Sequence, residues 1–321
     1  MDLAIPQREE VLNTQEALLP YVHRTPVLES ALLNELSGAR LYFKCENFQK
    51  MGAFKMRGAM NAVLQLSEAE KEAGVVTHSS GNFGQAVALA AKNLGIKAYI
   101  VMPSSAPAVK KSAVRTYGGL ISECEPTLTA REAEAVRIVK ATGATFLHPS
   151  NQIEVIMGNA TAAMELLESQ PELDFIFAPI GGGGLIAGTA LAVHYFGKHC
   201  KTIGGEPLAA DDAWRSLKSG KIETNTNTNT IADGLRTHLG DVNFPIIKQL
   251  VPEIIRVTED EIIESLRLIW ERMKIVVEPS SAVPLAALIK ERGRFRNKKI
   301  GIILSGGNVD LATLPFYQSK Q

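Results

Sequence analysis

Short apolar runs typical of strands alternate with longer runs typical of helices along most of this chain of 321 residues. Parallel strands need a crossover between them, and a helix usually supplies it, so such alternation produces parallel sheets covered by helices. The sequence therefore predicts an α/β fold with two lobes of twisted, mostly parallel sheet and helices on both faces. The strand-like runs are residues 41–45, 74–78, 97–102, 120–124, 144–148, 175–180, 202–205 and 299–304.

The length allows two domains, and a composition of 45% hydrophobic and 21% charged residues is ordinary for a globular protein. Four strand-like runs lie in one stretch, which predicts a small domain of residues 75–150 and a large domain of residues 1–74 and 151–321. Residues 258–261 are predicted to cap an amphipathic helix. The alternating Thr and Asn of residues 224–230 are predicted to form a surface loop.

The charge balance argues against a nucleic-acid or membrane-surface partner. Lys plus Arg and Asp plus Glu both number 34, so the formal net charge is zero. The first ten residues lack the basic start and apolar core of a secretion signal, and no uncharged apolar stretch reaches membrane-spanning length. Cys45, Cys124 and Cys200 are far apart and follow no metal-ligand spacing. We therefore expect a cytoplasmic protein with free thiols.

Four consecutive glycines, Gly181, Gly182, Gly183 and Gly184, separate a strand-like run from a helix-like run. A glycine run at such a turn leaves several backbone N–H groups unshielded by side chains. Those donors, together with the positive end of the helix dipole, are well suited to phosphate. A tight turn alone would need only one or two glycines, so the run predicts a phosphate site.

Which phosphate ligand binds there is open at this point. Gly182, Gly184 and Ala187 also match the G-x-G-x-x-G/A fingerprint of dinucleotide-binding enzymes. Glu206 closes the next strand-like run, where such enzymes place the acid that binds a ribose hydroxyl. A nicotinamide-dependent dehydrogenase is therefore an alternative on these residues alone.

An aromatic–lysine pair, Phe54 and Lys55, lies among small residues where a helix is expected to begin. A lysine amine can form a Schiff base with an aldehyde cofactor when partial desolvation lowers its pKa. Taken alone, such a lysine is more often a solvated surface charge. The interpretation of Lys55 as a cofactor-binding residue therefore depends on support from other segments.

Two further polar turns follow strand-like runs. Residues 79–82 read Ser-Ser-Gly-Asn, and residues 305–308 read Ser-Gly-Gly-Asn. These side chains can simply cap a helix or close a turn, but the same groups can present hydroxyls and N–H donors to an anion. Open α/β sheets bind ligands at the carboxyl ends of their strands, so polar turns at several strand ends predict one shared site.

These segments resemble the fold type II family of pyridoxal-phosphate enzymes, which includes serine/threonine dehydratases, serine racemases and 3-hydroxyaspartate dehydratases. Residues 54–59 resemble the cofactor-lysine motif and residues 79–82 the substrate-carboxylate loop. Residues 181–184 resemble the phosphate cradle, and residues 305–308 the turn at the pyridine nitrogen. The resemblance covers nearly the whole chain, with the motifs in the same order. The dinucleotide alternative explains neither Lys55 nor Ser305.

The resemblance implies a role for each of these residues. Lys55 would hold the cofactor covalently, with Phe54 against its ring, and the large domain would carry most of the site. Asn82 would contact the ring oxygen O3′, Ser305 the ring nitrogen, and Gly234 would lie close by. The substrate would be bound by Ser79, Ser80, Gly81 and Asn82.

The implied reaction is β-elimination, racemisation, or both, on L-serine, L-threonine or threo-3-hydroxyaspartate. Lys55 would move the Cα proton on one face of the substrate and Ser80 on the other. A serine beside the ring nitrogen is a neutral partner, which favours these outcomes over transamination. The resemblance also implies a homodimer. A non-catalytic homologue that binds pyridoxal phosphate is a further alternative.

The resemblance also bears on an acidic cluster, an arginine and a phenylalanine. Glu206, the Ala210 carbonyl and Asp212 would form an oxygen-ligand site for Mg²⁺, Ca²⁺ or Mn²⁺; the alternative is a solvated acidic turn that caps a helix. Arg131 would bind a second substrate carboxylate, or lie on the surface as an ordinary helical arginine. Phe83 departs from the family, which usually has histidine there, and this leaves the preferred substrate open.

Overall fold

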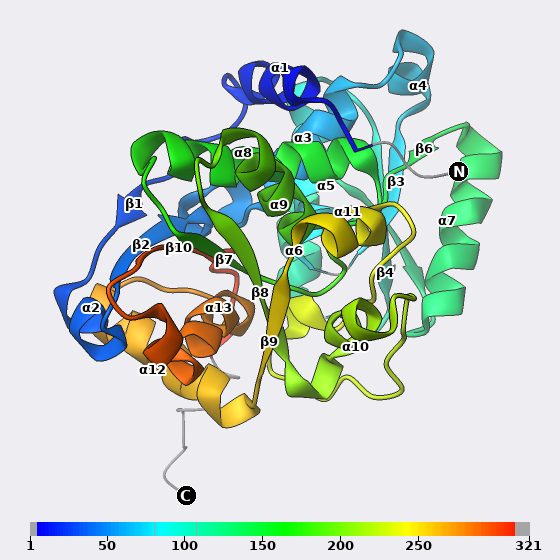
Figure 1. Cartoon of the computed structure of the whole chain (residues 1–321). Coiled ribbons are helices and arrows are strands. Elements are labelled where there is room, and N and C mark those ends of the chain that lie inside the picture. The colour runs from blue at the N-terminus through cyan, green and yellow to red at the C-terminus, as the bar shows by residue number, and fades with distance from the viewer. Residues whose placement is uncertain (1–4, 80, 107, 312–321) are drawn as a thin grey trace, which may run out of the picture.

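The computed structural model describes residues 5–79, 81–106 and 108–311. Within them, a large sheet and a small sheet run through the molecule (Figure 1). The large sheet has the strand order β1 (Val27–Leu28), β2 (Arg40–Cys45), β10 (Lys299–Leu304), β7 (Phe175–Pro179), β8 (Lys201–Pro207) and β9 (Glu253–Val257). The small sheet has the order β5 (Leu120–Cys124), β4 (Ala98–Pro103), β3 (Val75–His78) and β6 (Thr145–Phe146).

Parallel pairing dominates both sheets. All strand pairs of the small sheet are parallel, and in the large sheet only the short β1 runs antiparallel to its neighbour β2. The predicted α/β class with mostly parallel sheets is therefore confirmed. The two strands that the sequence did not reveal are β1 and β9, which lie at the two edges of the large sheet.

Helices cover both faces of the large sheet. In Figure 1, α8 and α9 lie on one face, and α12 and α13 on the other. The helices are α1 (Arg8–Leu18), α2 (Ala31–Ser37), α3 (Lys55–Leu64), α4 (Glu68–Ala73), α5 (Asn82–Asn93), α6 (Ala108–Thr116), α7 (Leu128–Thr142), α8 (Ile153–Ser169), α9 (Gly184–Phe196), α10 (Asp212–Ser219), α11 (Asn243–Leu250), α12 (Glu259–Met273) and α13 (Pro279–Lys290). None in the described residues is both long and apolar enough to cross a membrane.

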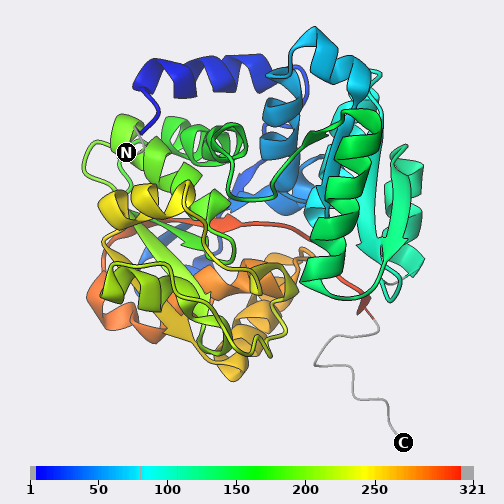
Figure 2. The same ribbon diagram turned by 90° about the vertical axis from the view of Figure 1, so that its right-hand side faces the viewer.

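We call the small sheet with α5, α6 and α7 the small lobe, and the large sheet with its covering helices the large lobe. Figure 2 shows the small lobe in cyan and green beside the large lobe. Helix α3 packs into the same hydrophobic cluster as the small sheet and α5, and it also contacts α8. The predicted domain boundaries remain a prediction, since α3 contacts both lobes.

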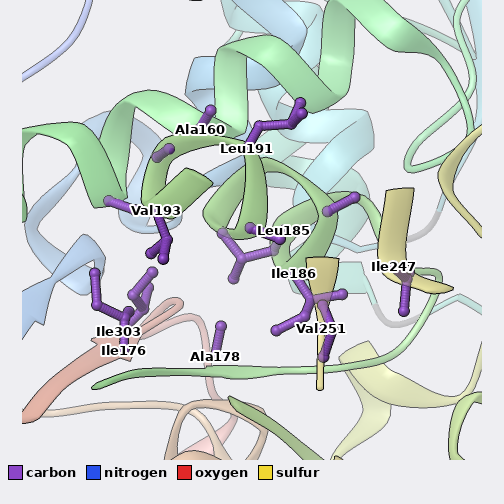
Figure 3. Packing of buried hydrophobic residues seen from close by; sticks show 14 of the residues in the cluster. Ala160, Ile176, Ala178, Leu185, Ile186, Leu191, Val193, Ile247, Val251 and Ile303 are labelled. Atoms are coloured by element: carbon purple, nitrogen blue, oxygen red, sulfur yellow. The ribbon is translucent and has the colours of Figure 1, made fainter. Parts of the chain in front are cut away.

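Helix α9 lies in the hydrophobic core of the large lobe. Its sequence is apolar on every side, and it is buried against α8, α11 and the strands of the large sheet. Leu185, Ile186 and Leu191 point into this core beside Ile176 and Ile303 of the strands (Figure 3). A helix that is hydrophobic all round belongs in a protein interior. The glycine turn that begins α9 is therefore anchored by a rigid element.

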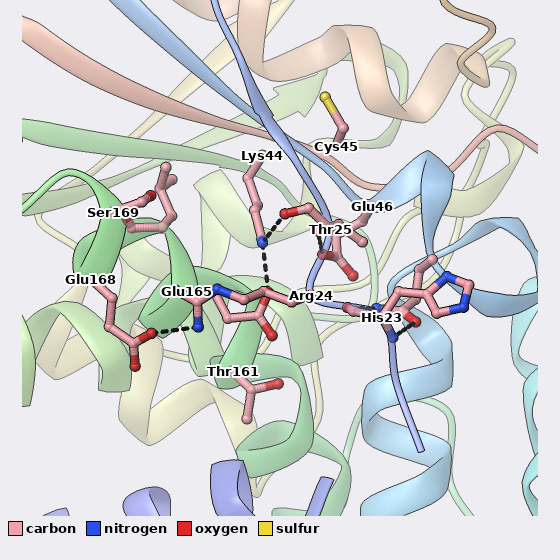
Figure 4. A network of polar contacts seen from close by, with 12 residues as sticks. His23, Arg24, Thr25, Lys44, Cys45, Glu46, Thr161, Glu165, Glu168 and Ser169 are labelled. Carbon is pink, nitrogen blue, oxygen red and sulfur yellow. Dashed lines mark hydrogen bonds and ion pairs between the residues drawn. The ribbon is translucent and has the colours of Figure 1, made fainter. Parts of the chain in front are cut away.

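A buried ionic network fixes α3 to the rest of the large lobe. Arg57, which is fully buried, donates to both oxygens of Glu46 at 2.7 and 2.9 Å and to both oxygens of Glu165 at 2.8 and 2.9 Å. Lys44 donates to Glu165 at 2.6 Å and to the Thr25 carbonyl at 2.7 Å (Figure 4). The two carboxylates and two cations balance, which buried charges require. Because Arg57 lies one half-turn after Lys55, the network fixes the start of α3.

Three smaller predictions are also confirmed. Thr258 and Glu261 form the reciprocal capping box at the start of α12. Residues 224–230 form a largely exposed loop without helix or strand. The thiols of Cys45, Cys124 and Cys200 are free.

Candidate active site

Lys55 lies at the first position of α3, directly after Phe54. The backbone N–H of Phe54 donates to the Ser305 carbonyl at 2.9 Å, and Ala53 forms an isolated bridge with Gly306. The start of α3 is thus joined to the turn after β10. Two motifs that are far apart in the sequence meet in one place, as ligand binding at the strand ends requires.

The amine of Lys55 lies in a mostly apolar environment. Its Nζ donates to the Pro149 carbonyl at 2.5 Å and lies 5.0 Å from the ring centre of Phe54 and 5.5 Å from that of Phe83. Burial lowers the pKa of Lys55 to about 8, although the charge of Glu278 partly opposes this. A larger fraction of the amine is therefore neutral and nucleophilic near neutral pH than for an exposed lysine.

The four glycines form a cradle at the carboxyl end of β7. Gly183 has a φ of 82°, which favours glycine, and it caps α9. A Cβ atom on Gly183 would lie 2.7 Å from Leu239, and one on Gly184 would lie 2.9 Å from the backbone of Ser150. A Cβ on Gly182 would collide with the Ser150 hydroxyl. No side chain can be added here without displacing a neighbour, so the backbone stays open to a ligand.

Two neighbouring segments hold this cradle. Asn243 donates from its amide to the Gly182 carbonyl at 2.8 Å and to the Ser150 carbonyl at 3.1 Å. On the other side, Gly234 packs so closely that its carbonyl would lie 2.9 Å from a Cβ on Gly181. Since Ser150 follows Pro149, the residue that binds the Lys55 amine, the cradle and the amine belong to one site.

Asn82 begins α5 and faces the large lobe. Its amide nitrogen donates to the two carboxylate oxygens of Glu278 at 3.0 and 3.2 Å. Its amide oxygen accepts from Asn308 at 2.9 Å. These bonds bring the substrate-loop motif of the small lobe to the turn after β10 in the large lobe.

Ser305 is buried, and its hydroxyl lies 3.1 Å from that of Ser281. The Ser281 hydroxyl also donates to the Gly306 carbonyl and accepts from the Gly306 N–H, both at 2.8 Å. Because the single hydroxyl hydrogen of Ser281 goes to the Gly306 carbonyl, the Ser305 hydroxyl is the donor in their contact. It would have to turn from Ser281 to donate to a ring nitrogen. Of the other substrate-loop residues, Ser79 accepts from the Gly81 N–H at 3.3 Å, and Ser80 lies outside the described residues.

Arg131 lies on α7 at the edge of the small lobe, and its Nε donates only a long 3.4 Å bond to the Thr127 carbonyl. Its charge reaches His78 at the end of β3, where burial first and Arg131 second lower the pKa of His78. Burial also lowers the pKa of His148 to about 4, and the charges of His78 and Lys55 make smaller contributions in the same direction. Two histidines with lowered pKa values thus lie between the charges of Lys55 and Arg131, near the ends of β6 and β3.

The acidic cluster is buried rather than solvated. Glu206 is fully buried and accepts from the N–H groups of Ala213 and Trp214 at 2.9 and 2.8 Å. Asp212, also fully buried, accepts from Asn225 at 2.6 Å and from the Leu239 N–H at 3.2 Å. Burial raises the pKa of Glu206 well above its usual range, and the charge of Asp212 adds to this.

This burial bears on both interpretations of the cluster. Glu206 is fully buried and caps α10 with both oxygens, whereas the dinucleotide alternative requires an acid that reaches the ribose of a bound ligand. Within the described residues, no three His, Cys, Asp or Glu side chains form a metal-binding group. A cation here would therefore need a backbone ligand such as the buried Ala210.

Three residues of this site were not predicted from the sequence: Glu278, Ser281 and Ser150. The signal that was available for two of them is Glu-Pro-Ser-Ser at 278–281, a polar stretch directly before an apolar helix. Such a stretch also suits an ordinary helix start with proline in the first turn. Only the packing of α13 against β10 shows that residues 278–281 face the site.

Comparison with known proteins agrees with this geometry. The model of the family described as pyridoxal-phosphate dependent enzyme matches residues 18–306. The serine racemase of Dictyostelium discoideum is 47% identical over 95% of this chain and 96% of its own length. The beta-hydroxyaspartate dehydratase of Paracoccus denitrificans is 47% identical over 97% of this chain and 99% of its own. A crystal structure of threonine deaminase from T.th. superposes with a TM-score of 0.90 at 41% identity, covering 95% of this chain and 99% of that one.

Proposed function

The chain belongs to the pyridoxal-phosphate dependent enzyme family, and from that premise we propose that it dehydrates and deaminates serine-like hydroxy amino acids, racemises them, or does both. Its substrates are L-serine, L-threonine and threo-3-hydroxyaspartate. One relative is a serine racemase and another a hydroxyaspartate dehydratase, each aligned over nearly its whole length. The observation that carries the proposal is the meeting of the Lys55 amine and the glycine cradle at the adjacent residues Pro149 and Ser150.

The residues fit a phosphate-bearing aldehyde. The partly buried amine of Lys55 supplies the nucleophile, and the backbone of residues 181–184 supplies N–H donors where no side chain fits. Ser305 and Asn82 offer a hydroxyl and an amide for the ring nitrogen and the ring oxygen. When bound, the cofactor stabilises negative charge at the substrate Cα.

The chain's own groups then handle the protons. The amine of Lys55 would be the base that removes the Cα proton on one face of the substrate. Loss of the β-hydroxyl as water, followed by hydrolysis, yields a keto acid and ammonia. Ser80 delivers a proton to the opposite face when the product is the D-amino acid. Both outcomes share one deprotonation, and their ratio depends on which following step is faster.

Substrate recognition belongs to the small lobe. Residues 79–82 bind the α-carboxylate through backbone N–H groups and hydroxyls at the start of α5. Arg131 binds a second carboxylate in threo-3-hydroxyaspartate through its guanidinium group. Phe83, buried beside Lys55, excludes water from the amine.

We also infer a divalent cation, a homodimer and a cytoplasmic location. Glu206 and Asp212 are fully buried, and no cationic side chain in the described part of the chain is bonded to either, so they suit an oxygen-ligand cation with the Ala210 carbonyl. The cation orders this part of the large lobe and takes no part in the chemistry. Free thiols are typical of cytoplasmic proteins. The proposed homodimer can be tested by sedimentation equilibrium.

The decisive experiment combines adduct mapping with product analysis. Protein supplied with pyridoxal phosphate is reduced with borohydride, and mass spectrometry locates the adduct; the three substrates are then assayed for keto acid, ammonia and D-amino acid. We expect the adduct on Lys55 and product from at least one substrate, with K55A losing both and the surface variant K71A keeping both. An adduct without any product would identify a non-catalytic homologue. Folded protein with no adduct on Lys55 would refute the proposal.

A further inference from the structure

Glu278 is a buried carboxylate at the centre of the site. It directly precedes α13 and is only 4% exposed. Its backbone N–H donates to the Gly306 carbonyl at 3.0 Å, and a Cβ on Gly306 would lie 3.0 Å from its Oε1 atom. The turn after β10 thus has a glycine where the carboxylate needs the room. The backbone hydrogen bond to Gly306 and the close packing against the same residue together fix the position of the Glu278 side chain.

The contacts around Asn82 fix which way its amide points. The oxygen of Asn82 accepts from the amide nitrogen of Asn308, and that nitrogen also donates to the Met51 carbonyl at 2.8 Å. The nitrogen of Asn82 donates to Glu278. Reversing the amide would set nitrogen against nitrogen at Asn308 and oxygen against a carboxylate at Glu278. Only one orientation of the amide therefore satisfies both neighbours.

The same contact crosses the boundary between the lobes. Asn82 comes from the small lobe, whereas Glu278 and Asn308 come from the large lobe. An amide nitrogen carries two N–H groups, and both bonds to Glu278 leave from this one nitrogen toward the same carboxylate. A single N–H shared between the two carboxylate oxygens can make both contacts, and the other N–H can then serve a second acceptor.

We propose that Glu278 is a positioning residue of the active site, which fixes the amide of Asn82 across the lobe boundary so that one N–H is held by the carboxylate and the other is directed to the ring oxygen of the cofactor. This role rests on the proposed function, because the contact of Asn82 with the cofactor does. Nothing in it requires Glu278 to touch substrate or cofactor itself.

The charges that face Glu278 make this contact sensitive to pH. Lys55 on α3 and Lys110 on α6 favour the ionised carboxylate, whereas Asp233, which pairs with Lys110 at 3.1 Å, disfavours it. Burial outweighs these charges and raises the pKa of Glu278 to about 7. A protonated carboxyl offers Asn82 a weaker acceptor than a carboxylate. The hold on Asn82 therefore strengthens as the pH rises through about 7.

Three variants test the role. E278Q keeps the shape and an acceptor oxygen but cannot ionise, E278A removes the acceptor, and E271Q makes the same change at an exposed carboxylate on α12. All are loaded with pyridoxal phosphate, reduced to map the Lys55 adduct, titrated across roughly pH 5.5 to 9 by visible absorption, and assayed for kcat and KM. The absorption titration reports on the protonation of the cofactor's ring oxygen. If Glu278 had a purely structural role, the pH dependence of the absorption would be the same in E278Q as in the wild type.

We expect all variants to form the Lys55 adduct and the wild type and E271Q to show an absorption transition near neutral pH that E278Q lacks. For E278A we expect kcat to fall about 10- to 100-fold, as for loss of a charged hydrogen bond, with KM changed less than about threefold. If the adduct forms but E278Q titrates like the wild type, the role of Glu278 is refuted while the proposed function stands. Absence of the adduct in the wild type would instead refute the proposed function. If E278A does not fold, the E278Q titration alone decides.

Discussion

The Nζ atom of Lys55 donates a hydrogen bond of 2.5 Å to the backbone carbonyl of Pro149. The next residue, Ser150, packs against Gly182 and Gly184 of the glycine cradle. The nucleophile and the anion site are therefore positioned by two adjacent residues of the loop between β6 and α8. Any change that moves this loop would therefore disturb both.

Substitution of Gly182 by alanine should weaken cofactor binding. The added Cβ would collide with the Ser150 hydroxyl, and overpacking of this kind costs about 1–3 kcal/mol, or roughly 5- to 150-fold in the dissociation constant for pyridoxal phosphate. G293A is the matched control, because a Cβ there meets no atom within 4 Å. Equal affinity of G182A and G293A in a fluorescence titration would argue against the cradle.

Substitution of Ser80 by alanine should separate the two reactions. If Ser80 carries the proton on one face only, S80A loses D-amino acid formation and keeps much of the keto acid formation from the L-substrate. Chiral chromatography and ammonia release measure the two products. The neighbouring S79A serves as the comparison, since it should alter both products in parallel. Parallel loss of both activities in S80A itself would contradict the assigned role.

Substitution of Arg57 by alanine should strongly destabilise the fold. It would leave Glu46 and Glu165 with unpaired buried charge, which costs about 3–5 kcal/mol in the free energy of unfolding. R294A removes an exposed pair with Glu253 and should cost no more than about 1 kcal/mol. Urea unfolding of both variants measures the difference. A small, equal loss in the two would mean that the buried network is not the stabilising contact described.

The stability of the protein should depend on pH through Glu278. Burial raises its pKa from 4.5 in the unfolded chain to about 7 in the folded protein, so the folded state keeps a proton that the unfolded state loses. The free energy of unfolding from this group therefore falls as the pH rises from 4.5 to about 7, by up to about 3 kcal/mol. The Tm of E278Q relative to wild type should rise over this interval and then level off. A constant difference across roughly pH 5 to 8 would be the contrary result.

The proposed cation should be visible as a change in thermal stability. Ligands that bind only the folded state raise Tm, so Mg²⁺ should raise the Tm of the chelator-treated wild type by several degrees and D212N should not respond. D211N is the control, because Asp211 bonds to Arg215 and Arg256 rather than joining Glu206. If D212N and D211N respond alike, the cation does not bind at Asp212.

The sequence was informative where a local pattern dictates structure. Strands β2, β7 and β10 are short apolar runs bounded by turn residues, and the turns after β7 and β10 are visible because glycine and serine follow directly. Strand β9 reads Glu-Ile-Ile-Arg-Val, and its charged residues are tolerated because it lies at the sheet edge. Strand β1 has two residues and exists only through its pairing with β2. Neither carries a signal that local sequence could reveal.

The site shows the same division. Lys55 and residues 181–184 stand out because a lysine after an aromatic residue and a run of glycines are unusual by themselves. Glu278 and Ser150 do not stand out, because a glutamate before a proline and a serine in a turn are common. Their importance comes from long-range packing, which brings Glu278 to Asn82 across 196 positions of the chain.

Strand β10 lies between β2 and β7, although it is the last strand to be synthesised. On the ribosome, β2 must wait for its neighbour until residues 299–304 emerge, on the order of tens of seconds later at ordinary rates of translation. The strands of the small sheet lie within residues 75–146 and can pair long before that. Nascent chains should therefore carry a folded small sheet beside unpaired strand edges, and those edges are what chaperones would need to protect.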